Sequence, residues 1–253
     1  QLLLKAKNID SINSHVEYHL NLGYFYYEWN FEVMEKYYRK RLLKPSYDNF
    51  TGLILDYATK TGRYNETFLI NERYIKKFPA ISHLYTYKAE ALMFLGDKDA
   101  SLEILERYNS KFRNDFYYLR ESTKLYFYLE EFEKSKNQLK NIRVKFPNEN
   151  PSMLIWLDAV FAKIDTKNED AKIYLDELKN LYDKHSSGSP AWFIALYYCY
   201  FEDYENTFIW LQKSYDRHDA EMTWLQEEPL LIPLRNEERY KELYHKIGFS
   251  KIK

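Results

Sequence analysis

A motif recurs along this 253-residue chain at intervals of 34 to 36 residues. Pro45, Pro79 and Pro147 lie 34 and 68 residues apart, and Gly62 and Gly96 are again separated by 34. Aligning the chain on these positions gives units that begin at Ser14, Asp48, Ser82, Phe116, Ser152 and Gly188. A period near 34 residues is typical of solenoids in which every unit is a helix, a turn and a second helix.

The scarcity of turn-forming residues supports the same conclusion. The chain holds only 6 Gly and 7 Pro, about 5% together, whereas these residues make up about 12% of average proteins. Sandwiches, barrels and doubly wound sheets need many turns, so the composition favours long helices joined by short corners. A hydrophobic content of 45% beside 30% charged residues is that of a folded chain.

Small or β-branched residues mark one place in every unit. The twentieth residue of the six units is Val33, Thr67, Ser101, Ser135, Ala171 and Thr207. A short side chain early in the second helix predicts a point at which the two helices of the unit cross closely. Apolar residues then follow at helical spacing, for example Leu102, Leu105, Tyr108 and Phe112.

Two stretches carry a family resemblance: Thr61-Gly62-Arg63-Tyr64-Asn65-Glu66-Thr67 leading to Phe78-Pro79, and Glu131-Phe132-Glu133-Lys134-Ser135 leading to Phe146-Pro147. Both resemble the tetratricopeptide repeat (TPR) family, and the register persists from about Ser14 to Asp219. The resemblance implies an all-α, right-handed superhelical solenoid of about six TPR-like helix pairs. The units are 14–47, 48–81, 82–115, 116–151, 152–187 and 188–219, after an N-terminal helix or the end of a preceding element in 1–13.

The remaining residues, 220–253, look like a cap. An aromatic-Leu-x-Lys-x-Tyr stretch from Trp210 to Tyr215 leads into a Pro-Leu-Arg corner at 233–235 and a last helix that ends at Gly248. This tail resembles the segment that closes repeat arrays in bacterial regulatory proteins, where such arrays are usually appended to a catalytic or DNA-binding domain. Because a terminal repeat exposes an apolar face, we expect Leu230 to Pro233 to cover it.

Catalytic, metal and cofactor sites are not predicted. His15 and His19 share a helix face, but a third ligand is missing at a suitable spacing. Cys199 is the only cysteine, and the aromatic residues around it indicate a buried thiol rather than a nucleophile paired with His185 or His218. We therefore expect no enzyme activity from these residues.

The resemblance implies a concave groove lined by the first helix of each unit, at its second, fifth, ninth, twelfth and thirteenth residues. The predicted groove residues are Tyr18, Tyr26, Asn49, Lys60, His83, Glu90, Tyr117, Arg120, Lys124, Tyr128, Trp156 and Trp192. Aromatic and arginine side chains dominate binding energies at interfaces, so this lining predicts a site for a protein or peptide partner.

Charge and hydropathy narrow the range of partners. The net charge of −1 gives no field that would gather nucleic acid or an anionic membrane. No apolar run reaches the roughly 20 residues that a membrane helix needs. A single cysteine fits a reducing compartment, so we expect a cytoplasmic protein, with the periplasm left open.

The leading hypothesis is a non-catalytic scaffold or regulatory module. We expect it to be part of a larger bacterial protein, because the chain begins with Gln1 rather than Met. One alternative is a small-molecule sensor whose pocket is lined by Phe127, Trp156 and Trp192. Another is the accessory domain of an enzyme whose catalytic part precedes Gln1. Self-association through exposed aromatic residues is a further possibility.

Overall fold

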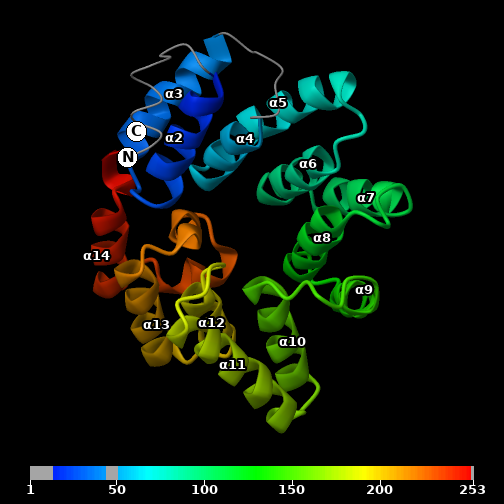
Figure 1. Ribbon diagram of the computed structural model, residues 1–253, viewed down its shortest axis with the longest axis vertical. Helices are drawn as coiled ribbons and strands as arrows, with labels where there is room; N and C mark the ends of the chain where they lie inside the picture. The colour runs from blue at the N-terminus through cyan, green and yellow to red at the C-terminus, as the bar shows by residue number, and fades with distance from the viewer. Residues whose placement is uncertain (1–13, 44–50, 252–253) are drawn as a thin grey trace.

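The computed structural model describes residues 14–43 and 51–251, which form helices and turns without a strand (Figure 1). The helices come in successive pairs: α2 (Ser14–Tyr26) with α3 (Phe31–Leu43), α4 (Thr51–Lys60) with α5 (Tyr64–Lys77), α6 (His83–Phe94) with α7 (Lys98–Asn109), α8 (Phe116–Tyr128) with α9 (Phe132–Lys145), α10 (Ser152–Ile164) with α11 (Asn168–Asp183), and α12 (Pro190–Tyr200) with α13 (Tyr204–Asp216). The prediction of an all-helical chain built from adjacent helix pairs is confirmed.

The corner between the helices of a pair has a recurrent backbone conformation. Gly62 and Gly96 have φ of 75° and 86°, and Glu130, Thr166 and Glu202 have φ of 65°, 61° and 60° at the equivalent place. One residue in the left-handed region reverses the chain and lets backbone amides close the end of the first helix. The corner therefore survives in pairs that lack glycine, at a modest cost in backbone strain.

The crossing points of the helices coincide with small residues. Ser101 donates a hydrogen bond to the carbonyl of Ala89 at 2.7 Å, and Ser135 donates one to the carbonyl of Thr123 at 2.9 Å. All four residues are fully buried. A bulkier side chain at either serine would push the second helix away from the first, so these positions fix the spacing within a pair.

The succession of pairs curves until its two ends meet, as the blue and red ends of the ribbon show in Figure 1. The indole of Trp29 stacks on the imidazole of His218 with 4.2 Å between ring centroids, and Phe31 lies 4.6 Å from Phe249. Behind them α14 (Glu238–Ile247) packs against α13, and the short helix η3 (Phe249–Lys251) packs against α3. The ends thus form a closed aromatic contact.

The segment between α13 and α14 lies on the inner side of this curve. It contains two 3-10 helices, η1 (Ala220–Trp224) and η2 (Pro229–Leu234). It lies against α12 of the last pair, where Leu230 to Pro233 were expected, and it also reaches α5 of an early pair. Its Leu230 carbonyl lies 3.1 Å from the Cys199 thiol of α12, and Tyr64 of α5 donates a hydrogen bond to Glu227. We call residues 220–234 the inner segment.

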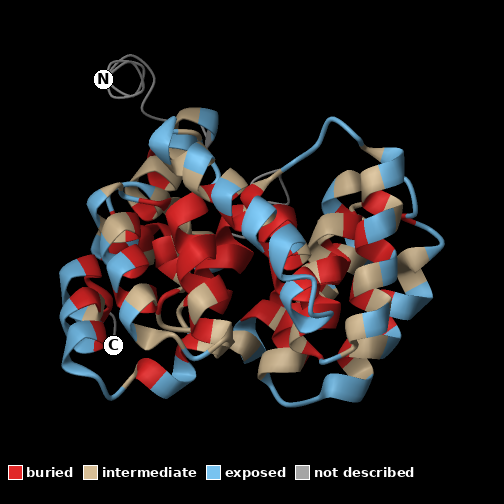
Figure 2. Cartoon of the chain, turned by 90° about the horizontal axis from the view of Figure 1, so that it is seen from below, coloured by how far each residue is buried: buried red, intermediate tan, exposed pale blue. Residues whose placement is uncertain are grey.

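Buried residues accordingly face the inside of the curve and the space between helices, whereas exposed residues follow its outer side (Figure 2). Trp156 and Trp192 are among the largest side chains that are almost completely buried. The apolar core thus continues from one pair to the next, and the inner segment completes it on the concave side.

Replacing Phe249 by alanine tests the end-to-end contact. Phe249 is 1% exposed, and the loss of such a side chain costs about 3 to 5 kcal/mol of unfolding free energy. Urea denaturation followed by circular dichroism measures it. Val144→Ala, at an 81% exposed site, is the control and should change stability by less than about 0.5 kcal/mol. Equal stability of the two variants would contradict the closed arrangement.

Candidate functional site

A cavity of about 470 Å³ lies between the inner segment and the concave surface. The first helix of every pair, or the turn that leads into it, lines the cavity, and the inner segment forms the remaining wall. Sites for small molecules commonly have volumes of about 300 to 1,000 Å³, so this space is of the size that holds one small ligand.

Eight of the twelve predicted groove residues line this cavity, namely Tyr26, Lys60, Glu90, Tyr117, Arg120, Lys124, Tyr128 and Trp192. The other predicted residues lie elsewhere. Tyr18 packs, half-buried, against the core, and His83 contacts Tyr117 edge to face with 5.9 Å between centroids. Trp156 is buried beside Phe127, 5.2 Å between centroids, and Asn49 lies outside the described residues.

Several lining residues were not predicted. Tyr87 and Glu121 occupy the sixth position of their units. That position lies one helical turn from the second and ninth positions, so helical spacing would have revealed it. Glu221, Trp224 and Glu228 come from the inner segment, whose return to the concave surface leaves no signature in the local sequence.

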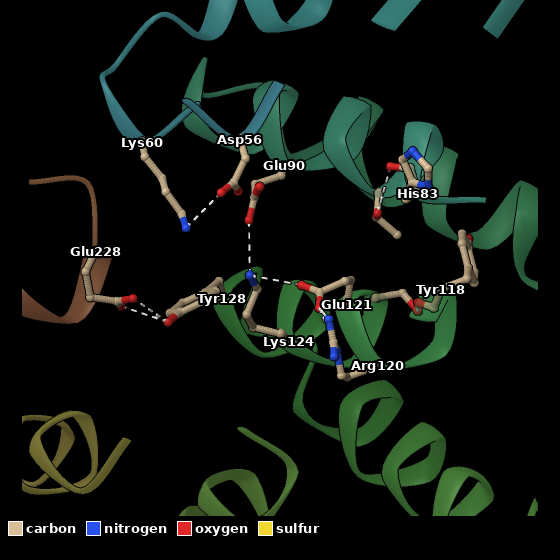
Figure 3. A network of polar contacts seen from close by, with 12 residues as sticks. Asp56, Lys60, His83, Glu90, Tyr118, Arg120, Glu121, Lys124, Tyr128 and Glu228 are labelled. Atoms are coloured by element: carbon tan, nitrogen blue, oxygen red, sulfur yellow. Dashed lines mark hydrogen bonds and ion pairs between the residues drawn. The ribbon is translucent and has the colours of Figure 1, made fainter. Parts of the chain in front are cut away.

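Ion pairs run along the wall of the cavity, within first helices and from α6 to α8 (Figure 3). The ammonium of Lys124 on α8 lies 3.2 Å from carboxylate oxygens of both Glu90 on α6 and Glu121 on α8. Arg120 lies 2.6 Å from Glu121, and the ammonium of Lys60 lies 2.9 Å from Asp56 on α4. Each cation that lines the cavity is therefore already paired with a carboxylate.

Burial and ion pairing act in opposite directions on the pKa values of the groups around Lys124. Burial alone lowers the pKa of Lys124, but the attraction of Glu90 and Glu121 outweighs it and raises that pKa above its ordinary value. Burial tends to raise the pKa of Glu121, yet Lys124 and Arg120 lower it to about 2. Burial dominates at Glu90, whose pKa is raised although Lys124 opposes the shift.

Two carboxylates of the inner segment have neutral partners instead. Glu228 accepts hydrogen bonds from the Tyr128 hydroxyl at 2.8 and 2.9 Å and from the Leu230 amide at 3.1 Å. Glu221 accepts a hydrogen bond from the Ser189 hydroxyl. Within residues 14–43 and 51–251 neither of them forms an ion pair, and burial raises the pKa of Glu228 to about 7.

Aromatic rings make up much of the remaining wall. The hydroxyl of Tyr26 donates a hydrogen bond to Asp56. The indole of Trp224 contacts two lysines, with the Lys60 and Lys124 ammonium groups 5.1 and 5.2 Å from its ring. Cation–π attraction in a buried site contributes about 2 kcal/mol, so these lysines anchor the inner segment through Trp224.

Cys199, His15 and His19, the reactive side chains considered in the sequence, do not line the cavity. The Cys199 thiol is buried against the Leu230 carbonyl, and burial raises its pKa to about 12, so the thiol stays protonated at neutral pH. His15 and His19 are exposed on α2. Among the described residues no cluster of three or more His, Cys, Asp or Glu side chains has the arrangement of a metal site.

Comparison with protein-family models and with curated proteins gave no match for this chain. The described helices are also too short or too polar for any of them to cross a membrane.

The pKa of Glu228 predicts how stability depends on pH. Because burial raises it from an ordinary 4.5 to about 7, the folded protein holds this proton more tightly than the unfolded chain does. Stability should therefore fall as the pH rises from 5 to 7, by about 1 kcal/mol per pH unit from this group. Denaturation at pH 5, 6 and 7 measures the slope.

Glu228→Gln should make that slope shallower, since the amide oxygen can still accept the same hydrogen bonds without titrating. Asp219, whose pKa burial raises to about 6, is present in both proteins and cancels from the comparison. Glu169→Gln, at an exposed site of α11, should keep the original slope. If the unfolding free energy of the original protein and that of Glu228→Gln depended on pH with the same slope, the raised pKa of Glu228 would be contradicted.

Proposed function

We propose that this chain is a non-catalytic binding module of the TPR type, which holds a small ligand in the cavity on its concave surface. The observation that carries the proposal is the cavity itself, to which all six helix pairs contribute and for which the inner segment forms one wall. Its wall combines aromatic rings with a few polar groups, the usual lining of a ligand site.

The TPR-like, right-handed superhelix is part of the proposal. It is supported by the repeated helix pairs, by the small residues at their crossing points and by the backbone geometry that recurs at the corners of this chain. The curvature of such an array follows from a small rotation between successive units, and it generates a concave binding surface.

A small ligand fits the cavity better than the protein or peptide partner that the sequence favoured. The inner segment already lies along the concave surface, where Trp224 and Glu228 contact residues that would meet a partner. A folded protein would have to displace that segment. The resemblance of residues 220–253 to caps of bacterial regulatory proteins supports a regulatory role, in which the ligand controls an attached or associated activity.

A thermal-shift screen with a chemically diverse library of small molecules tests the proposal. A ligand at 100 times its Kd stabilises the protein by about 2.7 kcal/mol, which raises Tm measurably. Tyr117 lines the cavity and is 37% exposed, so Tyr117→Ala should weaken binding about tenfold or more without unfolding the chain.

Tyr174→Ala is the matched control, because this tyrosine of α11 does not line the cavity. The affinity of the Tyr174→Ala variant for the same compound should equal that of the original protein. Compounds that bind the Tyr117→Ala and Tyr174→Ala variants equally well would place binding outside the cavity. A purified protein that converts a substrate unaided would contradict the non-catalytic assignment.

A further inference from the structure

The charge of the cavity wall is unbalanced among the residues that the structure describes. Five carboxylates line it, from Asp56, Glu90, Glu121, Glu221 and Glu228. The lining cations are Lys60, Arg120 and Lys124. Five minus three leaves two carboxylates in excess, and the ion pairs identify them as Glu221 and Glu228, the two cavity-lining carboxylates of the inner segment.

We propose that the ligand is a small organic cation, whose amine or guanidinium groups pair with the cavity-lining carboxylates of Glu221 and Glu228 and lie against aromatic rings of the cavity wall. This inference rests on the proposed function, since it names the class of ligand for the same site.

Electrostatics favours a cation over an anion. Burying a carboxylate without an opposite charge is costly, and Glu228 is only 5% exposed. A cation would offset that cost. An anion would add to the excess negative charge, and its possible donors, Arg120 and Lys124, already bind Glu121 and Glu90.

The rings provide the second part of the recognition. Tyr26, Tyr87, Tyr117, Tyr128 and Trp192 line the cavity together with the inner segment. Their faces attract ammonium and guanidinium groups and also cover the alkyl portion of such a ligand. A site with aromatic faces and spare carboxylates therefore discriminates against neutral and anionic molecules of the same size.

Proton linkage follows from the surroundings of Glu228. It faces Tyr128 and Lys124 of α8, Glu90 of α6 and the Cys199 thiol of α12. A cation that binds beside Glu228 favours its ionised form and so releases a proton. Affinity for the cation should therefore increase from pH 6 to pH 8.

Isothermal titration calorimetry with four probes of similar length tests the inference. Agmatine and 1,5-diaminopentane are the cations, adipate is the anion and 1,6-hexanediol is the neutral molecule. We expect the two cations to bind, with affinity rising between pH 6 and 8, and the other two to show no heat of binding. The double variant Glu221→Gln/Glu228→Gln should bind the cations about tenfold more weakly or worse.

Glu169→Gln, which removes one exposed carboxylate of α11, controls for net charge and should bind the cations unchanged. Circular dichroism checks that the double variant folds, and Glu228→Gln alone should abolish the pH dependence. Cations that bind the double variant as tightly as the original protein would overturn the inference.

Two further results separate this inference from the proposed function. Binding of adipate or hexanediol that Tyr117→Ala abolishes would overturn the cation assignment and leave the cavity as a binding site. Failure of all four probes would also overturn it, and the library screen would then decide whether the cavity binds ligands of another class.

Discussion

The contact between the inner segment and the concave surface determines both the shape of the molecule and its candidate site. Trp224 contacts both Lys60 and Lys124, which belong to different helix pairs. Glu228 is hydrogen-bonded to Tyr128 at a separation of 100 residues. Because these contacts connect distant pairs, they hold the curve closed and leave a cavity where an open solenoid would have a groove.

The buried ion pairs of the cavity wall also fix how neighbouring helix pairs pack. Removing charged groups from water is costly, and close oppositely charged partners offset that cost only when the geometry is good. The pairing of Lys124 with both Glu90 and Glu121 satisfies this condition across two adjacent helix pairs. Removing one charged side chain of this network would leave a buried charge without its partner. The network therefore specifies how α6 and α8 lie side by side.

Local sequence was sufficient to predict the helix pairs. Gly96 marks a corner and Ser101, five residues later, marks the crossing point of the same pair. The eight groove residues that line the cavity were those that the TPR resemblance implied. The cavity was not predictable in the same way. Tyr64 and Glu227 meet across 163 residues, and their contact depends on the sum of many small rotations between pairs. Glu221 and Glu228 therefore carried no sign of a binding role in the sequence.

Hydrogen–deuterium exchange of the inner segment tests this account most directly. The amides of Leu225, Glu228 and Leu231 donate hydrogen bonds within the segment, and both leucines are completely buried. We predict that these amides exchange as slowly as those in the middle of α12, because opening them requires the segment to leave the concave surface. Exchange as fast as that of the exposed turn at 147–150 would show that the segment does not stay on that surface, and would contradict the closed arrangement.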